Sequence, residues 1–235
     1  MSTISFNLER VRGRIAAACV AAGRASSEVT LLAVSKTFGA DAVFEAAAAG
    51  QRAFGENYLQ EAADKMAHLA RTDPSLALQW HCIGPIQSNK TRLVADHFDW
   101  AHTVDRLKIA QRLSQQRPAH LAPLNVCIQV NIDGGANKAG ALPDEAQALA
   151  QEVARLPGLV LRGLMTIPEP VPDFDSQRAV HQRARALFDQ LRSHGLALDT
   201  LSMGMTDDLE AAIAAGSTMV RVGSAIFGAR AARAA

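Results

Sequence analysis

This sequence predicts an α/β fold, a (β/α)8 barrel of parallel strands that forms one domain over residues 1–235. Short apolar, β-branched runs alternate with alanine-rich helical stretches, which is the pattern of a parallel sheet covered by helices. Eight such runs are present, and eight parallel strands close a barrel. The alternative is an open doubly wound sheet, but no G-x-G-x-x-G motif follows the first run. No Ser/Gly-rich linker divides the chain.

The first predicted element is an amphipathic helix within residues 1–24. Its apolar residues Phe6, Val11, Ile15 and Cys19 recur at helical spacing. Three arginines in this stretch would also suit a transit peptide, but an acidic residue interrupts them. We therefore expect the helix to belong to the mature fold.

The remaining elements follow in alternation. The expected strands are residues 29–36, 52–56, 78–84, 100–104, 124–132, 159–167, 200–204 and 218–223. The expected helices are residues 40–49, 58–70, 88–96, 105–116, 143–155, 175–194 and 207–215. Helix caps are predicted at Asp105, at Pro143 followed by Asp144 and Glu145, and at Thr206 followed by Asp207 and Asp208. The proline-rich stretch 168–172 is predicted to be a loop that leaves the sixth strand.

Composition excludes several classes of function. The net charge of +1 is spread along the chain, so it provides no basic footprint for a nucleic acid. No apolar run approaches the roughly 20 residues that a membrane-spanning helix needs. Cys19, Cys82 and Cys127 are far apart and form no Cys/His cluster, so neither a disulfide framework nor a metal site is expected. We expect a cytoplasmic protein, because free thiols suit a reducing compartment.

Polar residues follow nearly every predicted strand, at the barrel end where such folds place their sites. The residues at the strand ends, which are polar side chains with glycines and methionines beside them, are Lys36, Asn57, His81, Gly84, Asn131, Met165, Thr166, Ser202, Met203, Gly204, Arg221, Gly223 and Ser224. The strand bodies themselves are apolar. This combination predicts a ligand pocket above a packed core.

Lys36 ends the first predicted strand, "LLAVSK", where a turn residue such as Gly, Asn or Asp is usual. An amine in an apolar pocket has a lowered pKa because its charged form is poorly solvated. Such an amine is nucleophilic and forms a Schiff base with an aldehyde. The alternative is a surface lysine that extends from the strand end into solvent.

The last two strand ends indicate a phosphate site. "SMGM" and "RVGSAIFG" place glycines beside hydroxyl residues, and backbone N–H groups at such places bind anions. Each motif alone would also suit an ordinary turn. Together with a lysine on the first strand, they predict a phosphorylated aldehyde across the barrel mouth, and pyridoxal 5′-phosphate (PLP) has that shape.

Arg221 is the candidate partner of the PLP pyridine nitrogen. A guanidinium can only donate hydrogen bonds, so it would keep that nitrogen unprotonated and make the ring a poorer electron sink. The alternative is a structural ion pair between Arg221 and a carboxylate in the barrel.

The motifs "AVSKT", "FGENY", "HCIGPIQSNK", "GLMTI" and "LSMGMTDDLEAAIAAGSTMVRVGSAIFGAR" resemble those of the pyridoxal phosphate homeostasis proteins, the YggS/PROSC family. The resemblance runs from about residue 5 to 230. It implies a fold-type III barrel like the N-terminal domain of alanine racemase. It also implies a protein that binds PLP and buffers or supplies it inside the cell.

The resemblance also implies roles for single residues. Lys36 would form the Schiff base, Asn57 would contact the cofactor on the side of its ring, and Arg221 would face the pyridine nitrogen. His81, a candidate cofactor-binding residue, would be a packed or ring-contacting histidine. Ser202, Met203, Gly204, Gly223 and Ser224 would surround the phosphate. Lys138, in the loop "IDGGANKAG", would be a secondary PLP lysine, or else a solvated loop residue.

Two function classes stay open. A carrier would hold PLP and pass it to apo-enzymes, without catalysis and as a monomer. The alternative is a small racemase-like PLP enzyme acting on amino acids, with His81 or Tyr58 as its second base. Racemase chemistry needs two opposed bases, the second being a tyrosine from another domain, and the only tyrosine here is Tyr58. A cofactor-free aldolase barrel is disfavoured because its lysine generally lies on a later strand. We therefore favour the carrier.

Overall fold

The computed structural model describes residues 2–135 and 138–228. Its eight parallel strands form a closed barrel in the order β1 to β8, and β8 pairs with β1. The strands are β1 (Thr30–Val34), β2 (Ala53–Glu56), β3 (Gln79–Cys82), β4 (Trp100–Val104), β5 (Leu124–Val130), β6 (Leu159–Thr166), β7 (Thr200–Ser202) and β8 (Met219–Val222). The predicted (β/α)8 barrel is confirmed.

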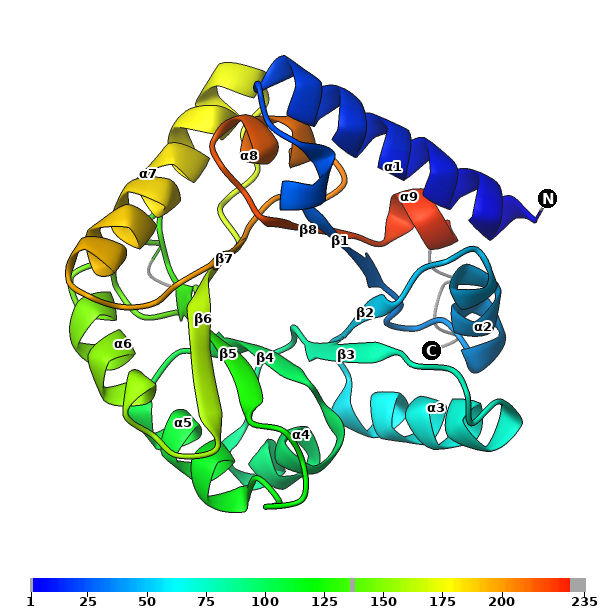
Figure 1. Ribbon diagram of the computed structural model, residues 1–235. Helices are drawn as coiled ribbons and strands as arrows, with labels where there is room; N and C mark the ends of the chain where they lie inside the picture. Colours follow the sequence, from blue (N-terminus) through cyan, green and yellow to red (C-terminus); the bar gives the residue numbers. More distant parts are fainter. Residues whose placement is uncertain (1, 136–137, 229–235) are drawn as a thin grey trace.

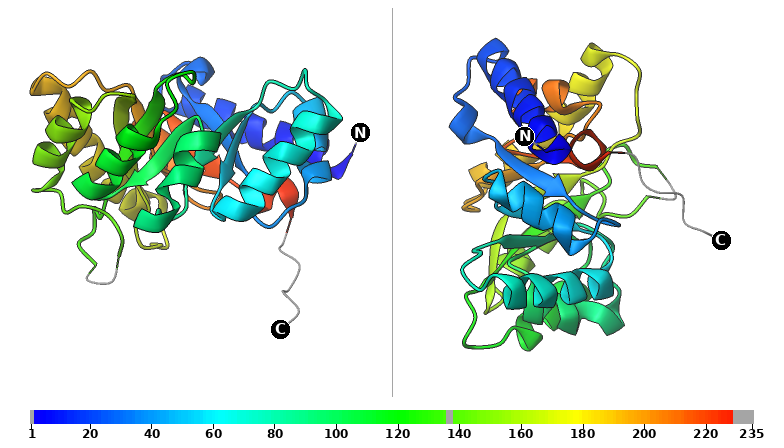
Figure 2. Two further views of the ribbon diagram at one scale, coloured as in Figure 1. Left: turned by 90° about the horizontal axis from the view of Figure 1, so that it is seen from below. Right: turned by 90° about the vertical axis from the view of Figure 1, so that its right-hand side faces the viewer.

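Helices surround the barrel (Figure 1). They are α1 (Thr3–Ala21), α2 (Ala40–Ala48), α3 (Leu59–Thr72), α4 (Thr91–His97), α5 (Leu107–Gln116), α6 (Ala146–Ala154), α7 (Phe174–Ser193), α8 (Leu209–Ala214) and α9 (Ser224–Phe227). The first helix packs across α8, α9 and α2, outside the β8–β1 seam. The side views of Figure 2 show the helices flanking the strands.

Two details of the helices differ from the expectation. The chain forms the short helix α9 directly after β8, which the expected helices do not include. The predicted caps at Asp105, Pro143 and Thr206 are wrong, because α5, α6 and α8 begin after Arg106, Glu145 and Asp208 without a side-chain cap. Side-chain caps occur instead at Ser2 and Asp173, which accept hydrogen bonds from the N–H groups of Ser5 and Ser176.

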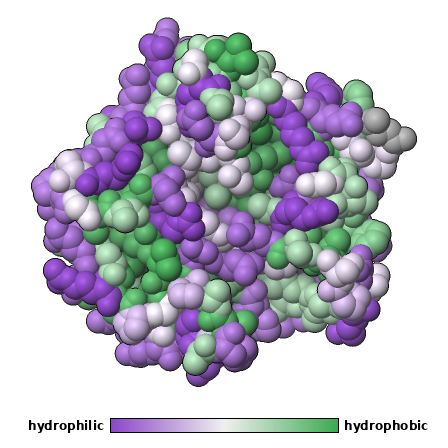
Figure 3. Space-filling model, in the orientation of Figure 1, coloured by the Kyte–Doolittle hydropathy of each residue, from purple (hydrophilic) through white to green (hydrophobic). Residues whose placement is uncertain are grey.

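The main apolar core lies between the strands and the helices. Strand β5, "LNVCIQV", has only Asn125 partly exposed, as expected for a parallel strand that is covered on both faces. The residues of α3 that face inward, Ala62, Lys65 and Leu69, are spaced along one side of the helix. In Figure 3 hydrophilic residues cover most of the rim, and hydrophobic residues show between them.

Inside the barrel, apolar and polar side chains are both present. Leu32, Val34, Ala53, Ile83 and Met219 form one small cluster, and Trp100, Cys127 and Met165 form another. Polar side chains share the same space; His81, His102, Ser202 and Arg221 are all at most 4% exposed. Polar side chains that are buried inside a barrel need hydrogen-bond partners there.

The described helices include none long and apolar enough to cross a membrane. Residues 2–135 and 138–228 contain no group of three or more His, Cys, Asp or Glu side chains that could hold a metal ion. All three cysteines are buried free thiols.

The close packing of β6 on β7 gives a stability prediction. A Cβ at Gly163 would lie 1.7 Å from the carbonyl oxygen of Thr200, so Gly163→Ala should lower the free energy of unfolding by about 3 kcal/mol. Urea denaturation measures this. The control is Gly13→Ala in α1, where nothing lies within 4 Å of the added Cβ, and which should raise stability by up to about 1 kcal/mol. Equal effects of the two changes would contradict the packing argument.

Candidate functional site

A cavity of about 350 Å³ opens at the carboxyl ends of β1 and β8. Lys36 borders it from the first strand, and Arg221, Gly223 and Ser224 border it from the last. The β1–β8 pairing, with Ala33 opposite Val222, explains why these distant parts of the chain meet. The structure thus brings four of the predicted site residues together.

Lys36 lies in a tight turn directly after β1. The N–H of Phe38 donates to the carbonyl of Ser35 at 3.1 Å, and Thr37, the third residue of the turn, has φ +69°. A turn with positive φ at this position is of the type that usually takes glycine or asparagine. A β-branched residue in this conformation stores about 1–3 kcal/mol of strain. Lys36 is therefore presented by a strained turn.

An aromatic pair connects this turn to helix α9. The Phe38 and Phe227 rings stack with centroids 5.2 Å apart, and Phe227 belongs to α9. Lys36 and Ser224, the first residue of α9, are therefore held on neighbouring walls of the cavity.

Arg221 is held by two hydrogen bonds inside the barrel mouth. Its Nη1 donates to the hydroxyl of Ser202 at 2.8 Å, and its Nη2 donates to the carbonyl of Thr166 at 2.8 Å. Burial lowers the pKa of Arg221 to about 10, so the guanidinium stays charged near neutral pH. These two contacts use two of its five N–H donors, which leaves donors for a ligand in the cavity.

From Arg221 a line of hydrogen bonds continues down the barrel. Ser202 Oγ lies 3.1 Å from Nδ1 of His102, and Nε2 of His102 lies 2.9 Å from Nδ1 of His81. Nε2 of His81 then lies 3.0 Å from Oε1 of Gln79.

The oxygen of Gln79 sets the direction of this line. Because Gln79 Oε1 can only accept, His81 donates to it from Nε2 and accepts from His102 at Nδ1, and His102 accepts in turn from the Ser202 hydroxyl. Each imidazole then carries its proton on Nε2, and the last proton is donated to Gln79. In this arrangement both histidines are neutral.

Burial also keeps the two histidines neutral. Desolvation lowers the pKa of His81 to about 3. It lowers the pKa of His102 well below 6.5, and the neighbouring His81 and Arg221 add to the effect. His81 stacks against Trp100 with ring centroids 5.1 Å apart. It is a packed residue of the barrel interior.

The loop between β7 and α8 supplies the remaining wall, and sequence reasoning had largely missed it. Met205, Thr206 and Asp207 border the cavity. The hydroxyls of Thr206 and Ser224 lie 3.4 Å apart, so two hydroxyls meet at one place. A signal was available, since Thr206 directly follows "SMGM".

Asp208 and His181 fasten this loop to the barrel wall. Asp208 accepts from the Met205 N–H at 2.6 Å and pairs with Nε2 of His181 at 2.9 Å. Burial by itself would raise the pKa of Asp208, but these hydrogen bonds outweigh it and lower the pKa. His181 comes from α7, so its role could be found only from the tertiary structure.

Several predicted site residues lie elsewhere. Asn57 borders a different cavity, together with Tyr58. His81, Ser202 and Met203 are completely buried, and Gly204 packs against α8, where a Cβ would meet that of Ala212 at 2.5 Å. The Ser202 hydroxyl, which we expected near a phosphate, bonds Arg221 and His102. His81, which we expected to be packed or in contact with a cofactor ring, has its contacts inside the barrel.

Lys138 lies in the loop after β5, of which Ala136 and Asn137 are outside the described residues. Its amine is 2.7 Å from Asp133 and 3.2 Å from Glu169, and it also donates to the carbonyl of Ile167. Lys138 is therefore an ion-paired loop residue. The chain end after Gly228, including "AR" of the closing motif, is also outside the described residues.

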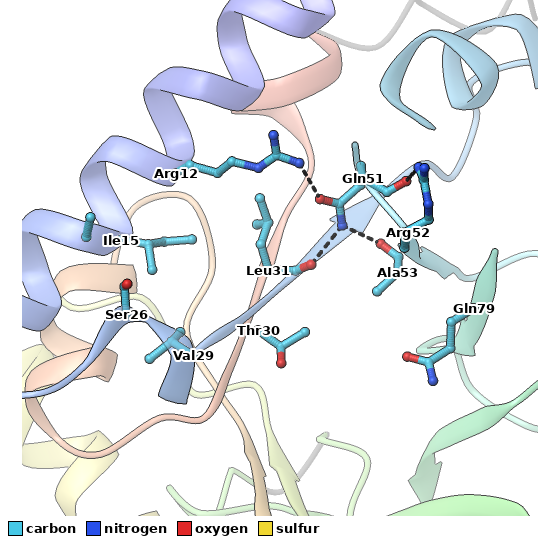
Figure 4. A pocket seen from close by; sticks show the side chains of 11 residues that line it. Arg12, Ile15, Ser26, Val29, Thr30, Leu31, Gln51, Arg52, Ala53 and Gln79 are labelled. Carbon is cyan, nitrogen blue, oxygen red and sulfur yellow. Dashed lines mark hydrogen bonds between the residues drawn. The ribbon is translucent and has the colours of Figure 1, made fainter. Parts of the chain in front are cut away.

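A larger cavity, of about 620 Å³, lies beside the beginning of β1 and β2 (Figure 4). Arg12 and Arg52 border it, and they donate to the carbonyls of Ala49 and Ala47 at the end of α2. Gln51 donates to the carbonyls of Leu31 and Ala53. The arginines thus bond carbonyls that the helix end leaves open, a structural role, and we place the candidate site at the other cavity.

Comparison with known proteins defines the class. The family model for the alanine racemase N-terminal domain matches residues 7–231. The alanine racemase of Clostridium difficile 630 has the same fold, with a TM-score of 0.70 over 99% of this chain and 58% of that one, at 15% identity. The barrel with a strand-one lysine is therefore of the alanine racemase N-terminal domain class.

Closer relatives define the family. The pyridoxal phosphate homeostasis protein of Pseudomonas aeruginosa is 60% identical over 98% of this chain and 97% of its own length. That of Escherichia coli K12 is 55% identical over 98% of both chains. The structure of PipY from Synechococcus elongatus PCC7942 with PLP bound matches with a TM-score of 0.82 and 36% identity, over 96% of this chain and all of that one. The chain belongs to the pyridoxal phosphate homeostasis protein family.

The buried histidines predict a loss of stability in acid. The folded protein keeps His81 and His102 neutral, whereas the unfolded chain protonates them near pH 6.5. The free energy of unfolding should therefore fall as the pH drops below about 6.5, by about 2 kcal/mol for each histidine at about pH 5. Urea denaturation at several pH values measures the slope.

Two variants identify the groups responsible for that slope. His81→Gln should remove about half of it, and His68→Gln, at an exposed position of α3, should leave it unchanged. Stability that is constant from neutral pH to about pH 5 would contradict the prediction.

Proposed function

We propose that this protein binds PLP through a Schiff base with Lys36 and acts in PLP homeostasis, buffering the cofactor or supplying it to apo-enzymes. The observation that carries the proposal is the single cavity in which Lys36 meets Arg221 and the Thr206–Ser224 hydroxyl pair. Relatives named as PLP homeostasis proteins and the PLP-bound PipY structure support it.

The cavity suits a phosphorylated aldehyde. Its volume of about 350 Å³ lies within the range of small-molecule sites. At Gly223 a Cβ would approach the carbonyl oxygen of Val34 at 3.1 Å and the Val34 Cβ at 3.3 Å, so glycine lets the ends of β8 and β1 pack closely beside the cavity. The nearby hydroxyls of Thr206 and Ser224 are suitable hydrogen-bond donors for a phosphate.

PLP would supply an aldehyde for the amine and a ring that can accept electrons. Lys36 would hold the aldehyde carbon, and Arg221 would donate to the pyridine nitrogen. Because Arg221 remains charged and the Ser202 and Thr166 contacts fix its orientation, it would keep that nitrogen unprotonated. This favours retention of the cofactor over chemistry that needs a strong electron sink.

The positions of the candidate second bases favour a carrier over an amino-acid enzyme. His81 is completely buried and both of its ring nitrogens are engaged. Tyr58 borders the cavity of Asn57. Among the described residues that border the cavity of Lys36, neither His81 nor Tyr58 is present. Neither of them is therefore placed to act as the second, opposed base that racemisation requires.

Further parts of the proposal concern the setting of the protein. We propose a cytoplasmic monomer, in keeping with its buried free thiols. The recipients would be apo forms of PLP enzymes. Lys138 would be a secondary lysine for PLP, since its amine lies in a loop at the same end of the barrel, held by Asp133.

The direct test is the absorption spectrum of the purified protein with PLP, before and after borohydride reduction and peptide mapping. Lys36→Ala should abolish the adduct at this position and weaken binding at least tenfold, as loss of a covalent bond requires. Its free energy of unfolding should stay within about 1 kcal/mol of the parent, because the side chain is at the cavity border. Lys108→Ala, at an exposed position, is the matched control.

The outcomes of this test are distinct. An adduct that maps to Lys36 supports the proposal, and one at Lys138 in the Lys36→Ala variant supports the secondary site. No band in the parent protein with PLP added would overturn the assignment of the ligand. Steady turnover of an amino acid, or exchange of its α-proton, would favour the enzyme.

A second prediction concerns Arg221. Arg221→Glu replaces a donor with a carboxylate, which should favour a protonated pyridine ring and shift the absorption of the bound cofactor. An unchanged spectrum with PLP still bound would mean that Arg221 does not face the ring. Arg106→Glu, an exposed change of the same charge, should have no effect on the spectrum.

A further inference from the structure

The residues on either side of Lys36 are held by side chains from β2 and α3. The Ser35 hydroxyl donates to Glu56 Oε1 at 2.6 Å, and the Ser35 carbonyl accepts from Lys65 Nζ at 3.0 Å. On the other side, the Thr37 N–H donates to Glu61 Oε1 at 2.8 Å. The turn that presents the amine is therefore fixed from outside the turn itself.

Lys65 joins these contacts into one unit. Its ammonium lies 2.6 Å from Glu56 and 3.4 Å from Glu61, in addition to the Ser35 carbonyl. Its side chain is 3% exposed and that of Glu56 is 0% exposed. All three ammonium donors are thus engaged, which makes Lys65 a structural cation with no proton free for the cavity.

Stability alone explains this buried pair poorly. An ion pair that is removed from water gains little over apolar side chains of the same size, because both charges lose their solvation. What the pair does provide is a fixed position for the Ser35 carbonyl and for the carboxylate of Glu61. Both of these groups bond the turn of Lys36.

The conformation of Thr37 shows why outside support is needed. Its φ of +69° is one that threonine adopts only at a cost, whereas glycine adopts it freely. The charged hydrogen bond from Glu61 is made to the N–H of this same residue, and bonds to charged groups are stronger than neutral ones. Glu61 thereby offsets the strain at the position next to the reactive lysine.

We propose that Glu56, Glu61 and Lys65 are positioning residues, which hold the Ser35–Phe38 turn in its strained form and so direct the amine of Lys36 into the cavity. The chemical use of that amine rests on the function proposed above. The conformation of the turn does not, so the two proposals can fail separately.

The experiment is a double-mutant cycle between Glu61→Ala and Thr37→Gly, with two measurements on the full chain. The first is PLP affinity by absorption titration. The second uses no PLP: it is the acetylation rate of Lys36 by acetic anhydride, relative to the exposed Lys108, determined by peptide mass spectrometry.

Glu61→Ala alone should weaken PLP binding about tenfold, as expected for a lost charged hydrogen bond, and should change the relative acetylation of Lys36. In the Thr37→Gly background the same change should weaken PLP binding about threefold or less, because glycine adopts the positive φ without strain that Glu61 would have to offset. Glu61→Gln keeps an oxygen acceptor for the Thr37 N–H and should restore most of the affinity.

Controls separate positioning from general damage. Glu61 is 34% exposed, so its truncation should leave the core packed. Asp64→Ala removes the same charge from an exposed position of α3 and should change neither measurement. Lys65 itself is left intact, since its removal would leave the buried Glu56 carboxylate without its cationic partner.

Equal losses from Glu61→Ala in the two backgrounds would overturn the proposal, as would unchanged acetylation of Lys36. If the parent protein forms no PLP adduct but Glu61→Ala still changes the acetylation of Lys36, and does so less after Thr37→Gly, the function fails and the positioning stands.

Discussion

The pairing of β8 with β1 is the constraint on which the site depends. The register places Leu32 opposite Arg221 and Ala33 opposite Val222. When this seam closes, the turn of Lys36 and the loop of Gly223 come to lie at one edge of the barrel. Helix α1 covers the outside of the seam, and the Phe38–Phe227 contact joins the segments that follow its two strands. An open sheet would leave the amine and the guanidinium at opposite edges.

Polar groups extend from this seam in two directions, one into the barrel and one toward helix α3. One line runs from Arg221 through Ser202 and the two histidines to Gln79. The other runs from the turn of Lys36 into the Glu56–Lys65 pair. Both lines place charged and polar side chains in the low dielectric of the protein interior, where a buried polar group without a hydrogen-bond partner is strongly destabilising. The molecule thus has polar contacts in place of apolar packing at Arg221 and at the residues on either side of Lys36.

This arrangement suits the proposed function, in which the barrel would keep a reactive cofactor without advancing its chemistry. Arg221, the proposed ring partner, is a donor that stays charged, and the histidine that the sequence offers as a base is committed to the interior. The alanine racemases share the barrel at low identity over only part of their length. A shared fold does not bring their reaction with it, since the reaction depends on the groups around the lysine.

The barrel and its eight strands could be predicted from the sequence alone. Periodicity and strand-end chemistry are local properties, so Lys36, Arg221, Gly223 and Ser224, which border one cavity, could be selected from them. Which other strand-end residues face that cavity depends on the packing of the whole barrel, which takes Ser202 and His81 into the interior and brings Thr206 to the wall. Only the tertiary structure joins His181 to Asp208 and Glu61 to Thr37. The physical reason is that a side chain's partners depend on how separate elements pack, and no local pattern specifies that packing.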